Sequence, residues 1–216
     1  RRRSGRRRRA VKQRRTVMTG IIDYGCGNIF SLISSLNAIG ERARVVTRAG
    51  DVSACDRIIL PGVGAFKNAA DKLENSGMAD AIKMFAKKGL PLLGICLGMQ
   101  LLFEKSFEYG ERSGLNLLEG QVKPLSEDTC LKIPHMGWNS LQFIRKDKLF
   151  RYVGEGEYVY FVHSFHAKNC KSVIATCEYG TTVCSAVGRD NVYGTQFHPE
   201  KSGDVGLRLL KGFTEL

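Results

Sequence analysis

The sequence predicts a single α/β domain with a mostly parallel central sheet flanked by helices and an additional region of mixed or antiparallel strands. In the first half, short apolar runs alternate with segments of helical periodicity, the pattern of a parallel sheet with helices on both faces. In the second half, strand-like runs follow one another with little helix between them. No internal repeat or Pro/Ser-rich linker divides the chain, so one domain is expected.

The first half is predicted to contain β-α-β-α-β-α units. A Gly-rich turn follows the first strand, and the helix after it stops at Gly40. Gly25 and Gly27 hint at a phosphate loop, but no third glycine stands at the spacing of a dinucleotide fingerprint. The predicted elements are, in order, a strand at 17–23, a helix at about 29–39, strands at 44–47 and 57–60, helices at about 65–76 and 78–88, and a strand at 90–95.

The second half is predicted to be richer in strands. Residues 106–137 have many turn formers and no regular periodicity, so an irregular segment is expected there. A final helix, at about 204–213, closes the domain. The strands expected between these segments are at 138–144, 157–162, 173–177, 182–187 and 192–197.

The basic charge of the chain is concentrated at its N-terminus. The formal net charge is +12, and residues 1–15 hold nine arginines, one lysine and no acid, which leaves 23 basic and 21 acidic side chains elsewhere. We expect residues 1–17 to form a tail with too few apolar residues to fold by itself, and residues 18–216 to form the domain. The tail suits nucleic acid, an anionic membrane or a targeting role. Because Met18 directly precedes the first strand, we favour a dispensable tail.

Cysteine usage and hydropathy point to a cytoplasmic protein. No apolar run approaches the ~18 residues of a membrane span. The seven cysteines are odd in number, scattered and without a Cys-x-x-Cys pair, so we expect free thiols in a reducing compartment. His163 and His166 have the spacing of a metal pair, but no further ligands stand at zinc-like spacing. We therefore predict no metal and no cofactor.

The central motif is Gly94-x-Cys96-x-Gly98. An apolar run at 90–95 precedes it, and Leu97 and the residues after it have the spacing of a helix that extends to Glu104. This order has the form of a nucleophile elbow with cysteine in place of serine. The alternative is a small buried cysteine in a core strand. We favour the nucleophile, because both glycines stand where a sharp strand-to-helix turn needs them.

His198 and Glu200 are the predicted partners of this cysteine. A cysteine nucleophile needs a base and a group that orients the base. His198 ends an apolar strand, Pro199 holds it extended, and the two-residue period of an extended segment puts Glu200 on the same side. The alternatives are a strand-end histidine bonded to backbone and a solvated carboxylate.

Acyl chemistry also needs donors aimed at the oxyanion. The N–H of Leu97 follows the nucleophile directly. The segment from Pro61 to Gly64 leaves a strand of the same sheet, and its glycines allow close backbone approach, so the N–H of Val63 is a second candidate. These residues alone predict a cysteine acyl-transfer enzyme for a small amide or ester.

Several segments together resemble the class I glutamine amidotransferase family. Residues 94–100 (GICLGMQ) resemble its nucleophile motif, and residues 197–200 (FHPE) resemble its His–Glu motif. More narrowly, four further segments resemble the members that supply ammonia to a separate cyclase subunit in histidine biosynthesis. These segments are 21–28, 61–64, 134–139 and 160–164. The resemblance runs from about residue 18 to the C-terminus.

The resemblance implies a role for each matched residue. Cys96 would form a γ-glutamyl thioester with L-glutamine, His198 would protonate the departing ammonia and then activate water, and Glu200 would orient His198. Gly62, Gln100 and the backbone of Ser164 and Phe165 would hold the amino acid end of the substrate. Met136, Trp138 and Lys201 would face the cyclase in a heterodimer, which suits an exposed aromatic, a methionine and a long basic chain; a core position is the alternative for Trp138.

Two departures from the family pattern stand out. Phe165 and His166 replace the paired tyrosines that members often show after the His-Ser step, which affects the expected partner contacts. The arginine-rich tail has no counterpart.

Two other functions fit parts of the sequence. Another class I subunit, serving anthranilate, aminodeoxychorismate or guanylate synthesis, is the nearer one, although Met99, Met136 and Trp138 argue against the first two. A nucleic-acid-binding protein that works through residues 1–15 is the other.

Overall fold

The computed structural model describes residues 17–216, so the predicted tail lies, apart from Val17, outside the described residues. The main sheet has eight strands in the order β2-β1-β3-β4-β14-β13-β12-β9. The first five are parallel, and β13, β12 and β9 continue the sheet as antiparallel strands. This mixed sheet confirms the predicted fold class. The bounds are β1 Thr19–Ile22, β2 Ala43–Val46, β3 Arg57–Leu60, β4 Leu92–Ile95, β9 Gln142–Phe143, β12 Val173–Glu178, β13 Thr182–Arg189 and β14 Val192–Thr195.

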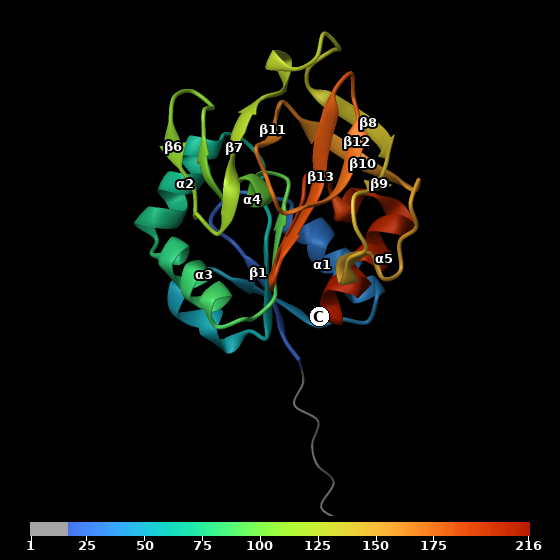
Figure 1. The fold of residues 1–216 in the computed structure, drawn as a ribbon. Helices are drawn as coiled ribbons and strands as arrows, with labels where there is room; N and C mark the ends of the chain where they lie inside the picture. The colour runs from blue at the N-terminus through green and yellow to red at the C-terminus, as the bar shows by residue number, and fades with distance from the viewer. Residues whose placement is uncertain (1–16) are drawn as a thin grey trace, which may run out of the picture.

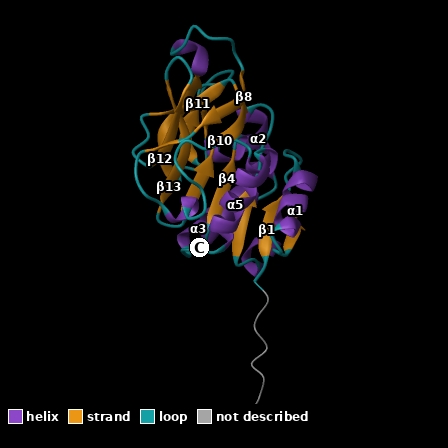
Figure 2. Cartoon of the chain, turned by 90° about the vertical axis from the view of Figure 1, so that its right-hand side faces the viewer, coloured by secondary structure: helices purple, strands orange, loops and turns teal. Residues whose placement is uncertain are grey.

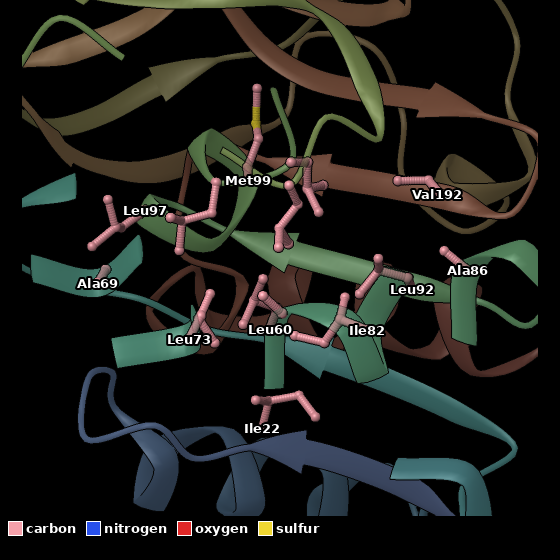
Figure 3. Packing of buried hydrophobic residues seen from close by; sticks show 14 of the residues in the cluster. Ile22, Leu60, Ala69, Leu73, Ile82, Ala86, Leu92, Leu97, Met99 and Val192 are labelled. Atoms are coloured by element: carbon pink, nitrogen blue, oxygen red, sulfur yellow. The ribbon is translucent and has the colours of Figure 1, made fainter. Parts of the chain in front are cut away.

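Helices cover both faces of this sheet (Figures 1 and 2). One face carries α1 (Ile29–Ala38) and α5 (Gly203–Thr214), which contact each other, and the other carries α2 (Phe66–Asn75) and α3 (Met78–Lys87). In Figure 3, apolar side chains of α2 and α3, among them Leu73 and Ile82, face Leu60 of β3 and Leu92 of β4. Each fully buried leucine or isoleucine contributes about 1.5–3 kcal/mol. The central strands are thereby held rigidly where the site residues leave them.

Two smaller sheets lie at one end of the molecule, at the top in Figure 1. One has the order β11-β7-β5-β6, and the other pairs β8 with β10 in antiparallel register. Their strands are β5 Phe103–Ser106, β6 Arg112–Ser113, β7 Leu118–Pro124, β8 His135–Ser140, β10 Tyr158–His163 and β11 Phe165–Lys168. Short 3₁₀ helices complete the described elements: η1 Ala49–Ala54, η2 Leu125–Glu127, η3 Lys148–Phe150 and η4 Pro199–Lys201.

Two predictions of local structure were wrong. The helix after Cys96, α4, is a single turn (Leu97–Gln100), and Glu104 lies in β5, where its carboxylate accepts a hydrogen bond from Gly120 N (2.9 Å). The run at 101–103 is completely buried, and its backbone bonds to residues 115–118 instead of continuing the helix. Residues 106–137 are not simply irregular, because Leu118, Gly120 and Val122 alternate inward along β7.

The strand prediction for 138–144 was also too simple. The segment is divided between β8 and β9, which belong to different sheets, and β11 was not predicted at all. β9 and β11 have only two and four residues, too few for a reliable alternating pattern.

The remaining general features concern membranes and thiols. Within residues 17–216, no helix has both the length and the apolar character that a bilayer crossing requires. All seven cysteines are free.

Candidate active site

Cys96 lies at the carboxyl end of β4, in the turn that leads into α4. Its backbone has φ 54° and ψ −110°, a positive-φ conformation that costs a non-glycine residue about 1–3 kcal/mol. Hydrogen bonds from Cys96 N to Thr195 O (2.7 Å) and from Gln100 N to Cys96 O (3.1 Å) hold the turn on both sides. The side chain is 7% exposed. This is the strained strand-to-helix turn that presents a nucleophile above a sheet.

Two glycines let the backbone close around this turn. A Cβ on Gly98 would collide with the carbonyl of Leu60, the last residue of β3. A Cβ on Gly94 would lie 2.6 Å from the carbonyl oxygen of Gly98. The Gly-x-Cys-x-Gly spacing is therefore imposed by close backbone packing between β3, β4 and α4.

A Gly98→Ala substitution tests this packing. The added methyl group meets backbone, which cannot rotate away, so we expect the elbow to shift and the urea midpoint to fall. Because a misplacement of about 1 Å at a reacting group can cost 10²-fold in rate, we expect at least that loss of activity. Gly50→Ala is the matched control, since nothing lies within 4 Å of a Cβ there. Equal activity and stability in the two variants would contradict the packing argument.

His198 and Glu200 form a buried pair after β14. His198 Nδ1 lies 2.8 Å from Glu200 Oε1, and each side chain is 2% exposed. His198 is extended before Pro199, but Glu200 reaches the imidazole from the 3₁₀ turn η4 and not from an extended segment. Since a carboxylate only accepts, Nδ1 carries a proton and donates it to Glu200. His198 Nε2 is buried and has no hydrogen-bond partner within residues 17–216, so it is free to exchange a proton with a reacting group.

The electrostatics of this pair favour a charged imidazole. Burial by itself lowers the pKa of His198, but the neighbouring Cys96 thiol and the Glu200 carboxylate favour the protonated ring and raise the pKa to about 10. Cys96 Sγ also lies 3.8 Å from Gln196 Nε2 and 3.8 Å from Val162 O. Cys96 and Glu200 therefore favour an imidazolium ion at His198, next to the nucleophile sulfur.

A cavity of about 410 Å³ opens over Cys96. It is large enough for a free amino acid. Of the predicted site residues, it brings together the nucleophile, the base, both oxyanion candidates, three substrate-binding residues and one partner residue. Its lining consists of Val63, Gly64, Cys96, Leu97, Gln100, Glu108, Pro134, Val162, His163, Ser164, Phe165, His198 and Lys201.

One part of the cavity wall is built around the carbonyl of Phe165. Phe165 O accepts hydrogen bonds from Gln100 Nε2 (2.9 Å) and from His163 Nδ1 (2.9 Å). Gln100 Nε2 also lies 3.1 Å from Gln196 Oε1. Gly62 does not line the cavity; it packs behind the elbow, against Leu97.

Sequence reasoning missed Glu108 and assigned no role to His163. Glu108 is the acidic residue of the cavity lining, and its Oε2 accepts a hydrogen bond from Phe66 N (2.6 Å) at the start of α2. Burial lowers the pKa of His163 to about 3, so its ring is neutral, and its Nε2 lies 2.9 Å from His135 Nδ1. No periodic signal marks Glu108, which lies in a loop 12 residues after Cys96.

His163 and His166 do not face a common point. His166 is buried and bonds to Asp128 through Nε2 (2.7 Å), whereas His163 bonds to Phe165 O and His135. Among residues 17–216, no group of three or more His, Cys, Asp or Glu side chains is arranged to hold a metal ion. Because His166 is 1% exposed, its side chain is not available as a surface contact for a partner.

The predicted partner residues lie on the surface beside the cavity. Met136 and Trp138 of β8 are 60% and 55% exposed, so the core alternative for Trp138 is wrong. The Trp138 ring packs edge-on against Tyr160 with 6.0 Å between ring centroids. Lys201 Nζ lies 5.9 Å from the centroid of the same Tyr160 ring. Trp138, Tyr160 and Lys201 thus form one surface cluster next to the triad, in which Trp138 and Lys201 are exposed and Tyr160 is half-buried.

Comparisons with known proteins agree with this geometry. The sequence profile of the family described as "Glutamine amidotransferase class-I" matches residues 20–214. The "Imidazole glycerol phosphate synthase subunit HisH" of Wolinella succinogenes is 50% identical over 92% of this chain and 100% of its own length. The protein of the same name from Caldanaerobacter subterraneus subsp. tengcongensis is 46% identical over 92% of this chain and 98% of its own length.

Solved structures show the same fold at low identity. A glutamine amidotransferase crystal structure has a TM-score of 0.73 at 20% identity and covers 91% of this chain and 97% of its own. PurLQS from Thermotoga maritima has a TM-score of 0.72 at 20% identity, covering 93% of this chain and 98% of the matched one.

Proposed function

Because the chain belongs to the class I glutamine amidotransferase family, we propose that it releases ammonia from L-glutamine through Cys96, His198 and Glu200. As a glutaminase subunit of imidazole glycerol phosphate synthase in histidine biosynthesis, it would deliver this ammonia to a cyclase subunit. One observation carries the proposed chemistry. Cys96 on its strained elbow lines the same cavity as His198, whose Nδ1 is fixed by Glu200.

The proposed reaction proceeds in two halves. The Cys96 thiolate attacks the γ-amide carbon of glutamine, and the carbon–nitrogen bond breaks as His198 Nε2 protonates the leaving ammonia. The resulting thioester leaves His198 neutral, so Nε2 can take a proton from water as the oxygen attacks the thioester carbonyl. Cys96 leaves as thiolate, His198 is again protonated, and glutamate departs. Backbone N–H groups of Val63 and Leu97, at the cavity wall, are our candidates for stabilising the oxyanion in both halves.

The cavity lining supports glutamine as the substrate. An α-ammonium group needs an anionic partner, and Glu108 supplies the carboxylate of the lining. Gln100 fixes the Phe165 carbonyl, and Ser164 and Phe165 line the same cavity. We therefore propose that Glu108 and this backbone segment hold the amino acid end while the amide points at Cys96.

The surface cluster beside the cavity supports docking of the cyclase there. Aromatic and methionine side chains are enriched in protein interfaces, and Trp138, Tyr160 and Met136 lie together on the β8–β10 pair. Lys201 is exposed, lines the cavity and directly follows Glu200. A partner on this surface would receive ammonia without exposing it to bulk water, where it would be protonated and lost as a nucleophile.

Glutamate release from glutamine, measured with different partner subunits, tests this assignment. We expect the rate to rise with the cyclase subunit of imidazole glycerol phosphate synthase together with its nucleotide ligand. We expect no rise with the synthase subunits that make anthranilate, aminodeoxychorismate or guanylate. Activation by one of those three in place of the cyclase would assign the chain to that pathway instead.

Removal of residues 1–17 should leave the enzyme intact. The tail carries charge without apolar anchors, so we expect an unchanged melting temperature and unchanged partner-activated turnover. Salt-dependent DNA binding by the full chain and the truncated chain is the accompanying control for a nucleic-acid role. A large fall in melting temperature or turnover on truncation would show that the tail matters.

We propose a cytoplasmic setting, because seven free cysteines suit a reducing compartment.

A further inference from the structure

Tyr24 connects the end of β1 to the segment that follows β3. The residue comes two positions after Ile22, the last residue of β1, and its side chain is 8% exposed. Its hydroxyl donates a buried hydrogen bond to Pro61 O at 2.9 Å. Pro61 opens the segment that carries Gly62, Val63 and Gly64. The hydrogen bond therefore links two strand ends beside the nucleophile.

Gly62 is the point where this segment touches the elbow. A Cβ there would lie 2.7 Å from Tyr24 Oη, 2.8 Å from Gly98 N and 2.9 Å from Leu97 Cβ. The α-carbon of Gly62 is thus seated between the tyrosine hydroxyl and the first turn of α4. Only a glycine fits, because a side chain would push the segment away from the elbow.

The far half of the segment has more room around it. Val63 is 45% exposed, and Gly64 has φ +95° with nothing within 4 Å of a Cβ. The segment therefore has one clamped end, at Pro61 and Gly62, and one free end, at Val63 and Gly64. The boundary falls at the peptide that carries the N–H of Val63.

Tyr24 is not placed to take part in proton transfer. Burial, and then the nearby thiols of Cys26 and Cys96, raise its pKa far above the ordinary tyrosine value, so the hydroxyl stays protonated. That proton points at Pro61 O and not into the cavity, whose lining does not include Tyr24. Its contribution is to geometry.

We propose that Tyr24 is a positioning residue for the oxyanion site: its hydroxyl holds the Pro61–Gly62 end against the elbow, so that only the Val63–Gly64 end moves when the site is completed. This inference rests on the proposed glutaminase function. A donor contributes to catalysis only when it is fixed relative to the reacting carbon before the reaction begins. The clamp supplies that fixed reference on the side next to Leu97.

Tyr24→Phe removes the hydroxyl and keeps the ring. We expect kcat for partner-activated glutamine hydrolysis to fall about tenfold, below the ~10²–10³ cost of losing a whole donor, with KM within twofold of wild type. Amide hydrogen exchange in a peptide covering residues 61–66 should become faster. Tyr193→Phe is the matched control, because Tyr193 is also buried and its hydroxyl donates to the carbonyl of Asp190 (3.0 Å), at the opposite end of the sheet strands.

The outcomes separate the clamp from a purely structural role. A kcat for Tyr24→Phe equal to that of Tyr193→Phe, with unchanged exchange at 61–66, would overturn the inference. So would a fall in kcat that is matched by the same fall in melting temperature in both variants. The proposed function has a separate test: it is wrong if the wild-type complex releases no glutamate from glutamine. In that case the hydrogen-exchange measurement still tests the clamp.

Discussion

Replacing Cys96 with alanine should reduce glutamine hydrolysis to background, a loss of roughly 10⁴-fold or more. The described structure places no other thiol on a strand-to-helix elbow, and Cys96 lines the cavity together with His198. His198→Ala should lose nearly as much, because nucleophile and base act as a unit and their losses do not add. Glu200→Gln should retain more activity, since an amide oxygen still accepts from His198 Nδ1. The measurement is steady-state glutamate release in the presence of the cyclase.

Cys177→Ala is the matched control for these variants. Cys177 is a fully buried cysteine of β12 outside the cavity, so its loss reports the effect of removing a core thiol alone. Glutamate release above background by the Cys96→Ala protein would assign the nucleophile elsewhere.

Docking of the cyclase should raise glutaminase activity by about 10²–10³-fold over that of the subunit alone. The segment from Pro61 to Gly64 is fixed at one end and loose at Val63, so a partner that binds one arrangement better shifts the population toward it. Recovery of one oxyanion donor is worth a factor of that size. Lys201→Ala and Trp138→Ala should lose most of the rise, because both side chains pack around Tyr160 beside the cavity.

A matched control for the lysine is available on α5. Lys211 Nζ lies 5.9 Å from the ring centroid of Tyr152, the same distance that separates Lys201 from Tyr160, but its ring partner is remote from the cavity lining. Lys211→Ala should therefore keep full activation. An isolated subunit as fast as the complex would contradict the coupling, as would equal activation of the Lys201 and Lys211 variants.

Transfer of amide ¹⁵N from glutamine to the cyclase product, despite excess unlabelled ammonium, would show delivery without release to solvent.

The features predicted correctly are those whose causes are local in the chain. The elbow depends on glycines two residues either side of Cys96, and Glu200 contacts His198 from two residues away, through a 3₁₀ turn in place of the extended segment that we expected. β4 lies in a nearly continuous apolar run and is fully buried, the pattern of a parallel strand covered on both faces.

The features that were missed depend on contacts far apart in the sequence. Glu108 reaches the cavity from a loop and caps α2, 42 residues away, and Tyr24 bonds to Pro61 across 37 residues. Neither contact leaves a periodic pattern. The helix expected through Glu104 ended after one turn because tertiary strand pairing prevailed over local propensity. His166 appears as a departure in the motif, but its buried bond to Asp128 could be found only in the folded structure.

The central claim is that Cys96 carries a γ-glutamyl group during turnover. Acid quenching of the complex during steady-state hydrolysis, followed by peptide mass spectrometry, tests it directly. The account predicts a γ-glutamyl adduct on the peptide containing Cys96 in the wild-type protein and none in Cys96→Ala. An adduct on any of the other six cysteines, or glutamate release by the Cys96→Ala protein at the wild-type rate, would contradict it.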